Sequence, residues 1–130
     1  KMKKKKILIV ASRYYPNIIK KKIEIISKTL EKDNIFYKVI MVPGSYEIPL
    51  AISKNIKSYN GCIALGCIIK GKTNHNQLIA QAIFNGLINI MLKSKKPIAN
   101  GILTTNTLAQ ARNRIKKKSF ESIKAIKSFI

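Results

Sequence analysis

A single histidine stands close to glycine, lysine and threonine residues near the middle of the chain. Residues 66–75 read Gly-Cys-Ile-Ile-Lys-Gly-Lys-Thr-Asn-His, and His75 is the only histidine in the protein. Imidazole exchanges protons near neutral pH, which makes His75 a candidate general acid or base. A purely structural role, in which His75 bonds to its own backbone at a helix start, is the alternative. The apolar run 62–65 before this segment and the apolar-periodic stretch after it predict a strand, a ligand-binding turn and a helix.

The same segment also matches the nucleotide-binding pattern G-x-x-x-x-G-K-[ST], from Gly66 to Thr73. Two observations oppose a phosphate-loop nucleotide hydrolase. Residues 67–69 are apolar and rich in β-branched side chains, so we expect extended chain rather than a loop that curls around phosphates. None of the five acidic residues follows an apolar strand in the position that would hold magnesium. The hydrolase therefore stays an alternative, and a smaller phosphate group is the better expectation.

The formal net charge of +21 on 130 residues raises the question of nucleic acid. Three of the basic residues are arginines and the rest are lysines spread along the chain, without interleaved aromatic residues. Nonspecific adhesion to polyanions is the expectation, with a dedicated nucleic-acid-binding domain as an alternative. No apolar run approaches the roughly 18 residues of a membrane span, so no membrane partner is expected. Cys62 and Cys67 belong to one apolar strand, which predicts core residues in a reducing cytoplasm.

Apolar periodicity predicts four strands alternating with helices in one domain that spans residues 1–130. The predicted strands are 6–11, 35–42, the run beginning at residue 62, and 98–103. The first helix carries Ile19, Ile23, Ile26 and Leu30 on one side, with its lysines on the opposite side, and ends at residues 33–34. A second helix is expected from residue 45 to about residue 56.

The third and fourth units complete the pattern. The helix after the central turn has a broad apolar stripe and further apolar surface elsewhere, which indicates a subunit contact; the stripe comprises Leu78, Ile79, Ala82, Ile83, Gly86, Leu87, Ile90 and Met91. A short helix is predicted from Thr107 to Arg114, followed by a lysine run and a final amphipathic helix. The fold class is a three-layer α/β/α sandwich with a four-stranded parallel sheet, flavodoxin-like, in which the turns at residues 14, 45, 72 and 104 converge at one edge.

Three blocks at these turns resemble the lumazine synthase family. Residues 42–49 read V-P-G-S-Y-E-I-P, and residues 65–75 read L-G-C-I-I-K-G-K-T-N-H. The third block is N-G-I-L-T-T at 100–105, followed by Gln110, Ala111 and Arg114. The resemblance implies condensation of 5-amino-6-ribitylamino-pyrimidinedione with 3,4-dihydroxy-2-butanone 4-phosphate, without a metal or organic cofactor. Dimethylribityllumazine, water and inorganic phosphate would be the products, at the penultimate step of riboflavin synthesis.

The resemblance also implies a role for each matching residue. His75 would shuttle protons, and Arg114 of a neighbouring subunit would grip the phosphate. The residues carried over as substrate-binding are Tyr14, Ser45, Tyr46, Glu47, Cys67, Ile68, Ile69, Lys72, Thr73, Asn100, Lys118 and Glu121. Structural alternatives stay open at several of these positions: a half-buried turn tyrosine, a first-turn acid, core side chains at 67–69, and a solvated arginine at a helix end.

The chain departs from the family pattern in three places. Asn100 stands where the family usually has an aromatic residue, and the segment from Arg114 to Lys118 is about four residues shorter than usual. The resemblance also implies an extra N-terminal strand that family members lend to a neighbour, and we expect this chain to form only part of it. The shared site implies a homo-oligomer of at least five subunits, and the sequence leaves open whether pentamers close into an icosahedral shell. A catalytically weakened member that acts as an assembly protein is the remaining alternative.

Overall fold

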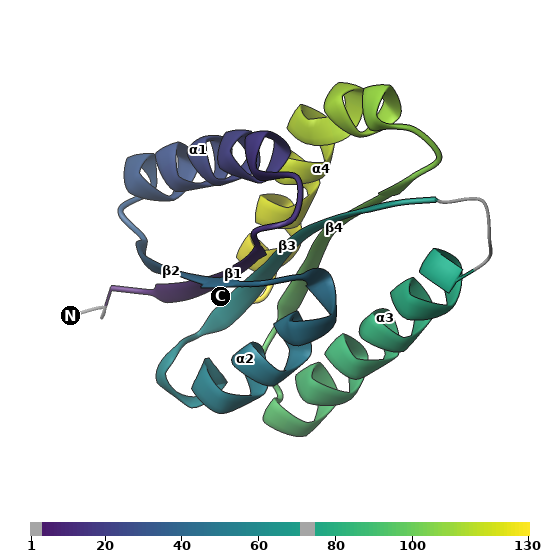
Figure 1. Cartoon of the computed structure of the whole chain (residues 1–130). Coiled ribbons are helices and arrows are strands. Elements are labelled where there is room, and N and C mark those ends of the chain that lie inside the picture. The colour runs from purple at the N-terminus through teal and green to yellow at the C-terminus, as the bar shows by residue number, and fades with distance from the viewer. Residues whose placement is uncertain (1–3, 71–74) are drawn as a thin grey trace.

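Four strands form one parallel sheet in the computed structural model, which describes residues 4–70 and 75–130. The strands are β1 (Lys6–Ser12), β2 (Phe36–Val42), β3 (Gly61–Ile69) and β4 (Ile98–Thr105), and their order across the sheet is β2-β1-β3-β4. The helices are α1 (Pro16–Lys32), α2 (Ile48–Asn55), α3 (His75–Ser94) and α4 (Leu108–Lys127), and short 3₁₀ turns η1 (Ser45–Glu47) and η2 (Ile56–Ser58) flank α2. The α/β/α sandwich predicted from the sequence is therefore confirmed (Figure 1).

The helices cover both faces of the sheet in pairs (Figure 1). On one face α2 and α3 pack over Leu8, Val10, Cys62 and Ala64. On the other face α1 and α4 pack over the alternate residues of the same strands, including Ile7, Ile9 and Ile63. Both faces of β1 and β3 are thus buried, as the nearly continuous apolar character of these strands requires. Cys62 and Cys67 are buried, as the sequence predicts for core residues.

The C-terminal part of the chain differs from the prediction. One uninterrupted helix, α4, replaces the predicted short helix, lysine run and final helix. The predicted start is correct, because Thr107 caps α4 and its Oγ1 accepts a hydrogen bond from the Gln110 backbone N–H at 3.2 Å. The lysine run 116–118 does not interrupt the helix, since lysine is a good helix former and the inward positions 111, 115, 119 and 122 carry small or apolar residues.

Two predicted helix faces also need correction. In α3 most of the predicted stripe is confirmed, because Ile83 and Leu87 are buried and Ile79, Ile90 and Met91 pack against the same core. Leu78 and Ala82 do not belong to this face, since Leu78 is 65% exposed and Ala82 is exposed. In α1 the lysines do not all lie opposite the apolar stripe, because Lys22 is completely buried. Lys22 lies four residues from both Ile18 and Ile26, and this spacing brings it to the inward face of the helix.

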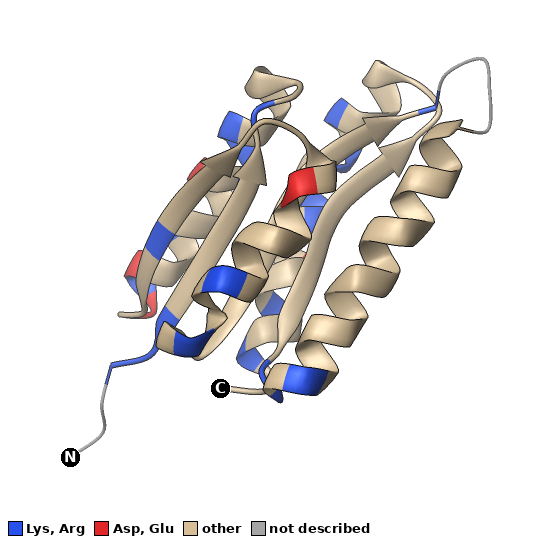
Figure 2. Cartoon of the chain, turned by 60° about the horizontal axis from the view of Figure 1, so that its bottom comes forward, with Lys and Arg blue, Asp and Glu red and all other residues tan. Residues whose placement is uncertain are grey.

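Charge is distributed very unevenly over the helices. Figure 2 shows basic residues on α1, α2 and α4, while most of α3 carries no charge. Lys93 is the single charged residue of α3, yet Leu78, Ile88 and Leu92 of that helix are exposed. An uncharged helix with exposed large apolar side chains is typical of a surface that another protein chain covers. Among the described residues, no helix is both long and apolar enough to cross a membrane.

Candidate functional site

The carboxyl ends of the four parallel strands lie at one edge of the sheet, and most of the predicted site residues follow them. The backbone N–H of Arg13 donates to the Val42 carbonyl at 2.8 Å, which joins the ends of β1 and β2. The Lys70 N–H donates to the Thr105 carbonyl at 2.8 Å, which extends the pairing of β3 with β4. Ligands of open parallel sheets bind outside this edge.

The turn after β2 packs directly against β3. Ser45 is buried, and a Cβ atom added to Gly66 would lie 2.5 Å from the Ser45 Oγ, so a larger residue at position 66 would force the Ser45 side chain to move. Tyr46 is 69% exposed and Glu47 is exposed. Glu47 Oε1 accepts a hydrogen bond from the Gly44 N–H at 2.9 Å, which fixes the start of the turn. The predicted segment 45–47 is therefore held rigidly beside β3.

The turn after β1 presents an exposed aromatic ring. Tyr15 has φ of 59°, in the left-handed region, and this conformation ends the strand and starts α1. Tyr15 packs against the apolar cluster that contains Cys67. The ring of Tyr14 is 65% exposed and meets the Tyr15 ring edge to face, with centroids 5.1 Å apart. The predicted stacking residue therefore stands at the surface of the same edge.

The end of β3 is extended, as predicted. Cys67 is buried, Ile68 and Ile69 are half-buried, and all three belong to the strand. This conformation leaves no curled loop at residues 67–69, which opposes the nucleotide-hydrolase alternative. His75 is the first residue of α3 and is exposed. Lys72 and Thr73, predicted to cradle the phosphate, lie outside the described residues.

A second group of predicted residues lies on α4. Arg114, Lys118 and Glu121 follow one another at helical spacing and line a cavity of about 410 Å³ together with Lys117 and residues 102–104. Three cations and one carboxylate around a cavity of this size suit an anionic ligand of small-molecule dimensions. Asn100 is exposed but does not line this cavity, and its Oδ1 accepts a hydrogen bond from the Ile102 N–H at 3.1 Å.

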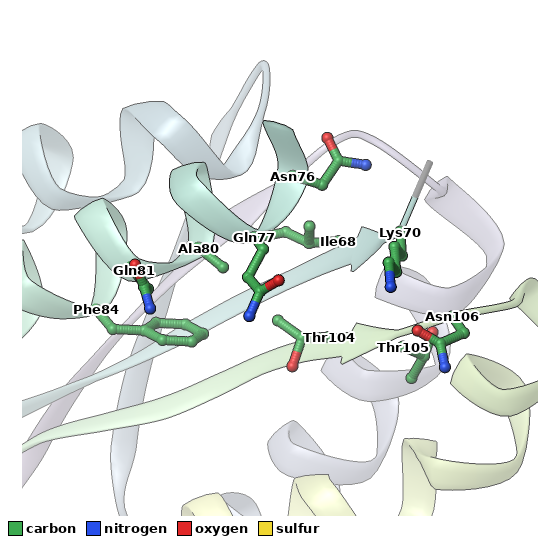
Figure 3. A pocket seen from close by; sticks show the side chains of 10 residues that line it. All are labelled: Ile68, Lys70, Asn76, Gln77, Ala80, Gln81, Phe84, Thr104, Thr105 and Asn106. Atoms are coloured by element: carbon green, nitrogen blue, oxygen red, sulfur yellow. The ribbon is translucent and has the colours of Figure 1, made fainter. Parts of the chain in front are cut away.

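A further cavity of about 410 Å³ lies between α3 and the ends of β3 and β4 (Figure 3). Among the described residues, Ile68 is the one predicted site residue in its wall; the other side chains are those of Lys70, Asn76, Gln77, Ala80, Gln81, Phe84, Thr104, Thr105 and Asn106. Neither this cavity nor the α4 cavity brings residues 14, 45–47 or 75 together with Arg114. The predicted site residues thus form two groups on this chain, one at the ends of β1 to β3 and one on α4.

The residue that sequence reasoning missed lies between these groups. Lys22 Nζ donates to the Gly66 carbonyl at 3.2 Å and also to the Gly101 carbonyl. Burial lowers the pKa of Lys22 from 10.5 to about 7; the charge of Lys118 acts in the same direction, and Cys67 opposes it. The sequence feature that could have identified Lys22 is its position, because residue 22 lies on the apolar helix face that Ile18 and Ile26 define.

These features define a class: a three-layer α/β protein whose predicted site residues follow the carboxyl ends of its strands, with a cavity lined by basic residues on α4. Within that class, the family model of 6,7-dimethyl-8-ribityllumazine synthase matches residues 4–130, and the chain belongs to this family.

Several proteins with similar sequences are named 6,7-dimethyl-8-ribityllumazine synthase. The 6,7-dimethyl-8-ribityllumazine synthase of Leuconostoc mesenteroides is 39% identical over 120 residues, which cover 88% of this chain and 77% of that protein. The synthase of Bartonella tribocorum is 37% identical over 118 residues, which cover 88% of this chain and 78% of that protein. The synthase of Tropheryma whipplei is 33% identical over 109 residues, which cover 84% of this chain and 70% of that protein. The chain therefore resembles these enzymes over most of its length.

Proposed function

We propose that this protein is a 6,7-dimethyl-8-ribityllumazine synthase. It condenses 5-amino-6-ribitylamino-pyrimidinedione with 3,4-dihydroxy-2-butanone 4-phosphate and releases phosphate and water. The observation that carries the proposal is the cavity on α4, where Arg114, Lys117, Lys118 and Glu121 gather around a space suited to a phosphorylated substrate in a chain of this family. Two free, buried cysteines support a reducing compartment such as the cytoplasm for this reaction.

The residues at the ends of β1 to β3 bind the pyrimidine substrate in this proposal. The exposed ring of Tyr14 stacks on the flat heterocycle, which the backbone of residues 67–69 meets along its edge. The fixed turn with Ser45, Tyr46 and Glu47 holds the ring and its ribityl chain, whose hydroxyl groups donate to the Glu47 carboxylate. The extended backbone of β3 suits this role because a strand end presents ordered N–H and C=O groups.

His75 and the α4 residues act on the phosphorylated substrate. The reaction forms an imine, expels phosphate and closes a ring, and each step moves a proton. His75 shuttles these protons, while Arg114 binds the phosphate group in two places and stabilises its departure. Lys118 adds a second positive charge, and Lys72 and Thr73 complete the anion cradle. Glu121 forms the polar rim of the cavity on α4. Asn100 of β4 takes the place beside the pyrimidine ring where the family usually has an aromatic residue.

The two groups come together between neighbouring copies of the chain. The residues at the ends of β1 to β3 of one subunit face Arg114 and Lys118 of the next subunit. This arrangement accounts for the separation of the two groups on a single chain. The uncharged, apolar face of α3 supplies the contact, since Leu78, Ile88 and Leu92 are exposed there. We propose a ring of at least five subunits, because a shared site of this kind repeats head to tail around a closed ring.

Product fluorescence tests the activity. The protein is mixed with both substrates in a chelator-containing buffer, beside His75→Ala and Arg114→Ala. We expect lumazine from the parent, a loss of about 10²-fold in kcat for Arg114→Ala from the missing phosphate contact, and a comparable loss for His75→Ala. Product from the parent no faster than the uncatalysed background would refute the enzyme. Assembly into rings without product would favour the weakened assembly protein, to which Asn100 and the uninterrupted α4 point.

Mixing the two variants tests the shared site. Arg114→Ala keeps an intact His75, and His75→Ala keeps an intact Arg114. In randomly mixed rings of equal amounts, about one quarter of the interfaces pair the intact halves, so activity should return to about one quarter of the parent value. A site contained within one chain predicts no recovery at any mixing ratio, because every chain then carries a lesion.

A further inference from the structure

Lys22 is a basic side chain with no exposure to solvent, and its Nζ donates hydrogen bonds to two backbone carbonyls. The side chain extends from α1 toward the sheet and reaches Gly66 on β3 and Gly101 on β4. These are adjacent strands, paired with Gly66 opposite Ile102. A carbonyl oxygen has two lone pairs, so a lysine can bind there in addition to the ladder of the sheet.

The surroundings are shaped to admit this side chain. A Cβ atom at Gly101 would lie 2.7 Å from the Ala64 carbonyl oxygen and 3.0 Å from Ser122 Oγ, so the strand surface under α1 and α4 has no room for one. On α4, the neighbouring inward positions are Ser119 and Ser122, which are small. The titratable groups that act on Lys22 are Cys67 from β3 and Lys118 from α4. Burial beside a second cation lowers the pKa of Lys22 to about 7, so near neutral pH the group can donate without retaining a full buried charge.

The two carbonyls border both groups of the proposed site. Gly66 directly precedes Cys67, where the backbone that meets the pyrimidine begins. Gly101 directly follows Asn100 and precedes Ile102, which lines the cationic cavity of α4. One side chain therefore joins the strand end used for one active site to the strand that serves the neighbouring site.

We propose that Lys22 is a positioning residue of the lumazine-forming reaction, which fixes the carboxyl halves of β3 and β4 by binding the Gly66 and Gly101 carbonyls together. Lys22 does not contact substrate. It holds the backbone at residues 67–69 where the pyrimidine ring binds, and this inference rests on the proposed function. We call these two hydrogen bonds of Lys22 the clamp. Removing the clamp should weaken binding of the pyrimidine ring more than it slows the chemical steps, because the contacts with the ring are made in both the ground state and the transition state.

The test compares Lys22→Met with Lys21→Met. Methionine has similar length but no donor. Lys21 is the exposed neighbour on the same helix, so Lys21→Met controls for the loss of one lysine and its charge. For Lys22→Met we expect KM for the pyrimidinedione to rise about tenfold or more, with kcat within about threefold of the parent. Lys21→Met should match the parent. Equal kinetic constants for the two variants would overturn the proposal.

Two further measurements separate this proposal from the proposed function. Should the parent form no lumazine, the enzyme assignment falls, and backbone amide exchange at 66–69 and 101–103 decides the clamp. Faster exchange in Lys22→Met alone supports it, and unchanged exchange overturns it. Should Lys22→Met fail to fold, NMR of the lysine side chains in the parent decides instead. Amino hydrogens of Lys22 that exchange as fast as those of surface lysines would overturn the clamp, and protected ones support it.

Discussion

The buried Lys22 should make the stability of this protein rise with pH just above neutrality. Its pKa is about 7 in the folded protein and 10.5 when the chain is unfolded. Between these values the unfolded state binds more protons at this position than the folded state, so the free energy of unfolding increases with pH. With these two pKa values, the increase from pH 7 to pH 9 amounts to about 2 kcal/mol.

The window ends near pH 9 because the cysteines act in the opposite direction. Burial raises the pKa of both Cys62 and Cys67, so above the ordinary thiol pKa of 9.0 the folded state retains protons that the unfolded state loses. Stability then falls with further increase in pH. A rise from pH 7 to a maximum near pH 9, followed by a fall, is therefore the expected profile of the free energy of unfolding.

Urea unfolding at pH 7, 8 and 9, at one fixed protein concentration, measures this profile for the parent, Lys22→Met and Lys21→Met. The difference between parent and Lys22→Met should change by about 2 kcal/mol across the window, in favour of the parent at pH 9. Lys21→Met should follow the parent in parallel. A difference that stays constant within about 0.5 kcal/mol would refute the reasoning, since Lys22 would then titrate alike in both states.

Three other substitutions, and Gly86→Ala as a control for the first of them, test the packing, the site and the subunit contact. Gly66→Ala places a Cβ atom 2.5 Å from the Ser45 Oγ and should cost about 1–3 kcal/mol in urea unfolding, whereas Gly86→Ala on α3, where a Cβ meets nothing closer than 3.5 Å, should be neutral or stabilising. Asn100→Phe adds an aromatic surface at an exposed position of β4 and should lower the KM of the pyrimidinedione about two- to tenfold; an unchanged KM would remove position 100 from the site. Leu92→Glu places a charge at a side chain that is 68% exposed on α3, and sedimentation should show smaller species; rings as stable as those of the parent would exclude this helix from the contact.

Most of the fold could be predicted from the sequence because the strands are apolar on both faces. Such runs identify buried parallel strands without any knowledge of their partners, and the breaks between them carry proline, glycine or asparagine. The extended conformation of residues 67–69 followed in the same way from β-branched side chains, and it opposes the phosphate-loop motif. In both cases the local sequence was sufficient to predict the conformation of the backbone.

The errors arose where neighbouring elements, rather than local sequence, decide the outcome. The break predicted after Arg114 came from the density of lysines, but α4 continues because its inward residues pack on the sheet. Lys22 was assigned to the solvated side by its type, although its position lies on the apolar face. The sequence does not contain the two carbonyls that receive its ammonium, which meet only when β3 and β4 pair. The residues that line the cavity beside α3, such as Gln77 and Gln81, carried no pattern that would distinguish them from surface amides.

The position of Lys22 also bears on how the proposed ring would work. If each site takes its pyrimidine-binding half from one subunit and its phosphate-binding half from the next, every chain belongs to two sites at once. The Gly66 carbonyl borders one of these sites and the Gly101 carbonyl the other, and the same ammonium binds both. A displacement of β4 by a bound phosphate would then change the backbone position of residues 67–69 of the same chain. This change would alter binding of the pyrimidine in the adjacent site. In Lys22→Met that link is absent, so any cooperativity between sites for the phosphorylated substrate should be lost together with the tight KM for the pyrimidine.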